Sequence, residues 1–136
     1  TDGFVAKYLG SNGSYVWAQK MIGTLECVPN GIAFDSSKNV LSTGYFDGTC
    51  NFGGAPLVSR NGSYDVYVMK NTSSGTPVWQ QSFGGVSTDQ GYGISTASDG
   101  YVGVCGAFSS TTGTFAGGQI LTSAGSYDIF IQRMAP

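Results

Sequence analysis

The chain has 136 residues, enough for one domain. Charged residues make up 10% of the sequence, the net charge is −2, and there is no His. Six basic residues are too few to neutralise a phosphate backbone, so nucleic-acid binding is excluded, and the lack of His removes the usual general base near neutral pH. Because no apolar run approaches about 20 residues, we also expect no membrane insertion.

The predicted elements are all β-strands, in keeping with 22 glycines and 13% aromatic residues. In chain order, the strands fall in residues 1–23 (two strands), 31–35, 39–46, 65–70, 77–83 and 93–133 (three strands). A Gly-rich excursion from Asp47 to Tyr64 separates the strands 39–46 and 65–70. Short links between the other strands favour antiparallel pairing. The sequence therefore predicts an all-β fold.

An internal repeat organises these strands. The segment Ser-Tyr-Asp-Val-Tyr-Val-Met-Lys at 63–70 returns 63 residues later at 126–133, and residues 2–7 carry a third copy. Further matches follow in the same order at a spacing of about 62 residues. They pair Trp17 with Trp79, Gly31 with Gly93, Gly44 with Gly106, and Phe52 with Phe115. We expect Trp17 and Trp79 to be equivalent, substantially buried residues.

The strand 65–70 is apolar on both faces. Val66 and Val68 lie on one face, whereas Tyr67 and Met69 lie on the other. A strand of this kind must be covered on both sides, as in a stack of sheets. A four-stranded sheet that is buried on both faces and repeated along the chain is the blade of a β-propeller, although a β-solenoid or a sandwich remains open.

The chain is predicted to be a single β-propeller-like segment. The phase of the repeat divides it into blades, whose strands are lettered a to d outward from the innermost. Residues 1–23 hold strands c and d of one blade, 31–85 form a complete blade, and 93–133 hold strands a to c of the next. The chain thus starts and ends in mid-blade. Because it begins at Thr1 with no Met, we expect a processed form or an excerpt of a longer chain.

Residues 31–46 read Gly-Ile-Ala-x-Asp-Ser-Ser-x-Asn-Val-x-x-Thr-Gly-Tyr-Phe. Together with Asp-x-Phe-Val-x-Lys, the Trp-containing strand and Gly-Gly, this pattern resembles the bacterial SBBP β-propeller repeat family over nearly the whole chain. The copy around 97–105 is looser. The resemblance implies a propeller fold on extracytoplasmic proteins and implies no chemistry.

The candidate site residues begin with the repeat Asp, present as Asp2, Asp65 and Asp128. Such an Asp can bind a cation or sugar hydroxyls, but its return in every copy favours a turn residue that accepts backbone N–H groups. We find no calcium loop, no glycosidase carboxylate pair and no nucleophile elbow. We therefore expect no catalytic residues, no metal site and no cofactor.

The three cysteines are Cys27, Cys50 and Cys105. Their spacing does not suit a zinc site. A disulfide between Cys27 and Cys50 is one alternative in an oxidising compartment. We favour the other, in which all three are small buried apolar side chains.

Three Asn-x-Ser/Thr sequons occur at Asn12, Asn61 and Asn71, all in expected turns, where a glycan can be accommodated. Asn-Gly turn chemistry is the simpler interpretation. For sugar binding by the protein itself, Asp89 and Tyr92 are the candidates, since a carboxylate can bind hydroxyls and an aromatic ring can stack on a sugar face.

These observations predict a non-enzymatic, extracellular or cell-surface module with a structural or adhesive role; the alternative is a glycan-binding lectin. Open blade faces and strand edges are expected to pair with other copies of the chain or with the remainder of a longer one. In a self-assembly, the strand around Trp17 would complete a blade made by residues 93–133 of another copy, giving a ring or a filament.

Overall fold

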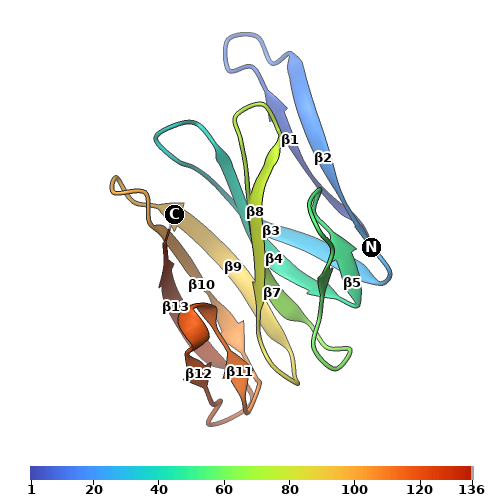
Figure 1. Cartoon of the computed structure of the whole chain (residues 1–136), viewed down its shortest axis with the longest axis vertical. Helices are drawn as coiled ribbons and strands as arrows, with labels where there is room; N and C mark the ends of the chain where they lie inside the picture. The colour runs from blue at the N-terminus through green and yellow to red at the C-terminus, as the bar shows by residue number, and fades with distance from the viewer. Residues whose placement is uncertain (136) are drawn as a thin grey trace.

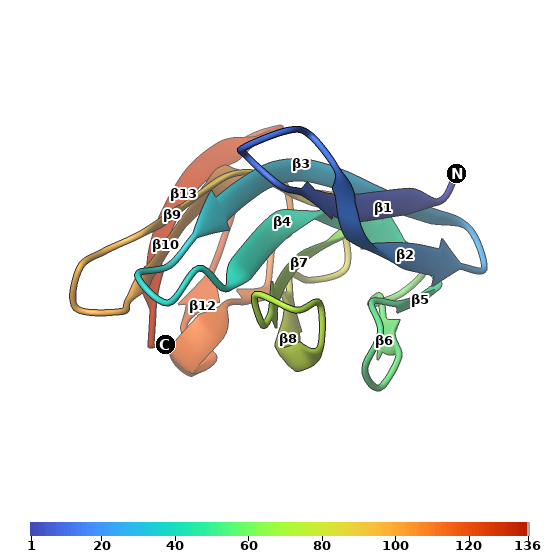
Figure 2. The ribbon, with the colours of Figure 1, turned by 90° about the horizontal axis from the view of Figure 1, so that it is seen from above.

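The computed structural model describes residues 1–135 and consists of β-strands with one short 3-10 turn, which confirms the all-β prediction. The described residues form four antiparallel sheets, of which the three larger ones lie side by side (Figures 1 and 2) and the fourth is a two-stranded hairpin. Their main strands are β1 (Gly3–Tyr8), β2 (Tyr15–Gly23), β3 (Glu26–Phe34), β4 (Val40–Asp47), β7 (Asp65–Asn71), β8 (Pro77–Phe83), β9 (Asp89–Thr96), β10 (Val102–Phe108) and β13 (Asp128–Met134).

The middle sheet is a four-stranded meander in the order β3-β4-β7-β8, as expected for strands a to d of one blade. The first sheet contains β1 and β2, which are the repeat equivalents of β7 and β8. The third sheet has the order β13-β10-β9, with no strand beyond β13 in the described range. The sheets are therefore blade-like, and over residues 1–135 they do not close into a ring.

The Gly-rich excursions contain short strands that the sequence did not reveal. They are β5 (Thr49–Asn51) and β6 (Leu57–Val58) in the middle repeat, and β11 (Gly113–Thr114), the 3-10 turn η1 (Ala116–Gly118) and β12 (Ile120–Leu121) in the last. β5 pairs with the end of β2 in the first sheet, and Gly84, just after β8, forms a bridge with Thr114. Each excursion thus ties its own repeat to the preceding sheet.

The innermost strands begin earlier than expected. β3 starts at Glu26 rather than at residue 31, and β9 starts at Asp89 rather than at residue 93. Both strands contain a β-bulge, at Asn30 and at Tyr92, where the register with the neighbouring strand shifts by one residue. A bulge breaks the two-residue alternation that sequence reasoning follows, and this is why the first half of each strand was missed.

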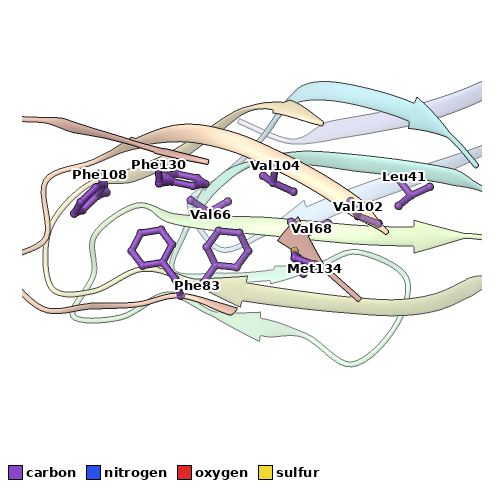
Figure 3. Packing of buried hydrophobic residues seen from close by; sticks show 10 residues of the cluster. Leu41, Val66, Val68, Phe83, Val102, Val104, Phe108, Phe130 and Met134 are labelled. Carbon is purple, nitrogen blue, oxygen red and sulfur yellow. The ribbon is translucent and has the colours of Figure 1, made fainter. Parts of the chain in front are cut away.

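Two hydrophobic cores join the three sheets. One lies between the first and middle sheets and includes Met21, Phe46 and Tyr67. The other lies between the middle and third sheets, where Val66, Val68 and Phe83 meet Val102, Val104, Phe108, Phe130 and Met134 (Figure 3). The strand β7 contributes to both cores, one on each face. The prediction that this strand is covered on both sides is therefore confirmed.

Candidate binding surfaces

The outer faces of the first and third sheets expose side chains whose repeat equivalents in the middle sheet are buried. Val66 and Val68 are fully buried, whereas their equivalents in the third sheet, Ile129 and Ile131, are 82% and 85% exposed. At the other end of the chain, Phe4 is 65% exposed, although its equivalent Tyr67 is buried. Residues that form a core inside the chain are thus presented to solvent at both ends.

A groove runs along the free edge of β13. It has a volume of about 260 Å³ and is lined by Phe115, Ala116, Gln119, Leu121, Phe130 and Gln132, among others. Gln132 donates from Nε2 to the carbonyl of Ala116 at 2.9 Å, but its buried Oε1 has no hydrogen-bond partner among residues 1–135. The sequence analysis did not predict this groove. The signal that could have located it is the return of Phe52-Gly-Gly as Phe115-Ala-Gly-Gly, because that second copy forms part of the groove lining.

The repeat Asp residues all accept a backbone N–H. The bonds are those from Gly23 to Asp2 (3.2 Å), from Arg60 to Asp65 (3.2 Å) and from Ala124 to Asp128 (2.6 Å). Asp65 and Asp128 bond to amides five and four residues earlier, as expected of a turn residue, whereas Asp2 accepts from the last residue of β2, 21 residues away.

Asp65 differs from the other copies because it is fully buried and lies close to a second buried carboxylate, Asp89. Asp65 Oδ1 and Asp89 Oδ2 both lie within 2.7 Å of the point where a β-carbon on Gly84 would stand. Burial raises the pKa of Asp65 to about 6, and the neighbouring Asp89 adds to this, although Arg60 acts in the opposite direction from an ion pair of 2.8 Å. In the part of the chain that the structure describes, Asp65 Oδ1 has no hydrogen-bond partner.

Asp89 and Tyr92, the candidates for sugar binding, do not form one site. Asp89 is fully buried and accepts hydrogen bonds from Gly85 N and Ser110 Oγ, both at 2.7 Å. Tyr92 is half exposed and donates to Gln90 Oε1 at 2.7 Å. The prediction that Asp89 reaches a sugar is wrong, because its oxygens hold the third sheet to the loop after β8.

Gly44 and Gly106 occupy equivalent places in β4 and β10, where the chain crowds around them. A β-carbon on Gly44 would overlap the carbonyl of Val28 and stand 2.9 Å from the ring of Tyr67. One on Gly106 would overlap the carbonyl of Gln90 and stand 2.7 Å from the ring of Phe130. Each glycine therefore makes room for the aromatic ring of strand c and for the bulged strand a.

Trp17 on β2 and Trp79 on β8 are half-buried, less than expected, and each packs at the border of one core. Trp17 Nε1 donates to the carbonyl of Ser73 at 3.1 Å, and Lys7 Nζ donates to the same carbonyl at 2.7 Å. These bonds fasten the first sheet to the loop between β7 and β8.

Cys27 and Cys50 form a disulfide, with their Cα atoms 6.2 Å apart. The bond joins β3 of the middle sheet to β5, which pairs with the first sheet. Cys105 is free and exposed on the outer face of the third sheet. The favoured interpretation of three small buried apolar side chains is therefore wrong, because two of the cysteines are bonded and the third is not buried.

The sequons differ in accessibility. Asn12 and Asn61 are exposed in loops. Asn71 is the last residue of β7 and is buried, so the expectation of a turn position is wrong there and the folded chain cannot present it to a glycosylating enzyme. The sequence signal failed because β7 runs one residue past the strand expected from the repeat.

No helix in residues 1–135 is long and apolar enough to cross a membrane. The same residues contain no group of three or more His, Cys, Asp or Glu side chains placed to hold a metal ion.

No family model matches the chain. Over 82 residues, it is 32% identical to an uncharacterised WD repeat-containing protein, L264, of Acanthamoeba polyphaga mimivirus. The match covers 56% of this chain but only 6% of that much longer protein. This distant similarity agrees with the blade-like sheets and suggests a β-propeller type of repeat. The finer resemblance to the SBBP repeat stays a prediction.

Proposed function

We propose that the chain is a non-enzymatic interaction module of β-propeller repeats, of the SBBP type, whose terminal sheets bind further sheets of the same kind. Ile129 and Ile131 carry this proposal, because their equivalents Val66 and Val68 are buried against a neighbouring sheet. An exposed apolar face of this kind is typical of a protein–protein contact. The partners are other copies of the chain or further blades of a longer polypeptide.

The disulfide supports a place outside the cytoplasm, on the cell surface or in a secreted protein. Bonds such as Cys27–Cys50 form and persist in oxidising compartments and are rare in the cytosol. The exposed sequons at Asn12 and Asn61 are compatible with such a location. A structural or adhesive role follows from this location together with the open faces.

The absence of enzyme activity is part of the proposal. Asp65 and Asp89, the two carboxylates that lie close together, are fully buried, so a substrate cannot reach them. The exposed residues of the third sheet are mainly apolar or uncharged, which suits burial against another sheet better than proton transfer.

The proposal is tested by light scattering of the 136-residue chain over a range of concentrations. We expect association that increases with concentration and is abolished by Ile131→Lys, because a buried unpaired charge would disrupt the contact. Val58→Lys is the matched control, since Val58 is an exposed apolar residue on β6, away from this face. A wild-type chain that stays monomeric at high concentration would contradict self-association, and saturable binding on a glycan array would favour a lectin instead.

A further inference from the structure

The free edge of β13 differs from its equivalent in the middle sheet. β7 pairs with β4 on one side and with β8 on the other, whereas within residues 1–135 β13 pairs with β10 alone. A strand edge without a partner presents backbone N–H and C=O groups that can pair with another extended segment. The groove described above lies along this edge.

The middle sheet shows what a filled groove looks like. β8 lies between β7 and the loop that follows β5, and Gln80 Nε2 donates to the carbonyl of Ala55 in that loop. Gly54 also lies against the Gln80 amide. In the third repeat, the equivalent loop residues Gly117 and Gly118 have open space where a β-carbon would stand. There, a carbonyl of the loop, that of Ala116, accepts instead from Gln132 Nε2 of β13 itself.

Gln132 supplies a second, independent observation. Its side chain lines the groove, and its Oε1 atom is buried with no donor from the described residues. A buried amide oxygen without a partner costs free energy that an incoming donor would recover. The equivalent residue in the middle sheet is Met69, which lies directly opposite Gln80.

We propose that the groove along β13 binds an extended segment that has the sequence pattern of β8 and runs antiparallel to β13. In the register of β7 and β8, Trp79 lies opposite Lys70 and Gln80 lies opposite Met69. The bound segment therefore places an aromatic residue opposite Arg133 and a Gln opposite Gln132. The amide of that Gln donates to Gln132 Oε1. This inference rests on the proposed function and names the kind of strand that one of its surfaces takes.

The same register distinguishes β8 from β2, the two strands d of this chain, as possible occupants of the groove. In β2, the place of Gln80 is taken by Ala18, which has no donor for Gln132. The groove is therefore selective for a β8-like strand over a β2-like strand, although both carry a Trp at the same position.

The test uses a fluorescein-labelled peptide of residues 76–84, titrated with the full 136-residue chain and followed by fluorescence anisotropy. We expect saturable binding, which Gln80→Ala in the peptide weakens about five- to tenfold through the loss of one buried hydrogen bond. A peptide of residues 14–22 should bind as weakly as this variant, and a scrambled peptide should not bind. Hydrogen exchange should show new protection in β13.

The chain variant Gln132→Met is the matched control, because Met is the residue at the equivalent position of the middle sheet. With this variant, the wild-type and Gln80→Ala peptides should bind equally. Equal binding of both peptides to the wild-type chain would overturn the proposal. Protection that appears in β7 would overturn it as well, because the peptide would then be displacing β8.

The outcomes also separate this inference from the proposed function. Self-association that Ile131→Lys abolishes, without any peptide binding, would leave the interaction module standing and refute the groove. Peptide binding by a chain that stays monomeric and is unaffected by Ile131→Lys would support the groove and refute association through the outer face.

Discussion

Val68 and Ile131 are repeat equivalents, but a neighbouring sheet buries Val68, whereas Ile131 is exposed. Truncating each to Ala therefore measures how much burial against that sheet contributes to the free energy of unfolding. Val68→Ala removes two carbon atoms from a fully buried side chain. At about 0.8 kcal/mol for each carbon plus a cavity contribution, we expect a loss of about 2–3 kcal/mol in the free energy of unfolding. Ile131→Ala removes more carbon but from a side chain that is 85% exposed, so its cost should stay within about 0.5 kcal/mol.

Urea unfolding of the dilute chain checks this prediction. With a slope of about 1–3 kcal/mol per molar urea, Val68→Ala should lower the midpoint by about 1 M at an unchanged slope. Ile131→Ala should leave the midpoint in place when the protein is dilute and should lower it only where the chain associates. Equal destabilisation by both substitutions in dilute solution would refute the assignment of the open face.

Three further predictions concern individual positions. Gly106→Ala should cost about 1–3 kcal/mol in the free energy of unfolding, because the new β-carbon has no room. Gly125→Ala places its β-carbon in open space and should leave the free energy of unfolding unchanged. Urea titration measures both, and equal costs would contradict the crowding at Gly106. Burial raises the pKa of Asp65 to about 6, above an unfolded value of about 3.9, so the folded state retains the proton and its stability should fall as the pH rises from about 4 through 6. Asp65→Asn should flatten this fall in a series of urea titrations, and a flat wild-type curve would contradict it. Reduction of Cys27–Cys50, 23 residues apart, should remove about 3 kcal/mol, and melting curves that coincide with and without reductant would contradict that contribution.

The sequence by itself determined the repeat and the order of strands within it. The copies of Ser-Tyr-Asp-Val-Tyr-Val-Met-Lys fixed the positions of β7 and β13, because a two-residue alternation of side chains specifies both the strand and its two faces. The apolar character of both faces of β7 was sufficient to predict a sheet on either side. The same equivalence predicted that the terminal faces are open.

Only the tertiary structure decided which polar residues are buried and what they contact. Asp89 and Asn71 look like surface residues in the sequence, yet neighbouring strands enclose both. The excursions form strands because they find a partner edge on the preceding sheet, and a two- or three-residue strand has too little pattern to be seen without that partner. The groove beside β13 likewise depends on how a loop of the third repeat sits against its own sheet, a long-range contact that a local alternation of side chains does not encode.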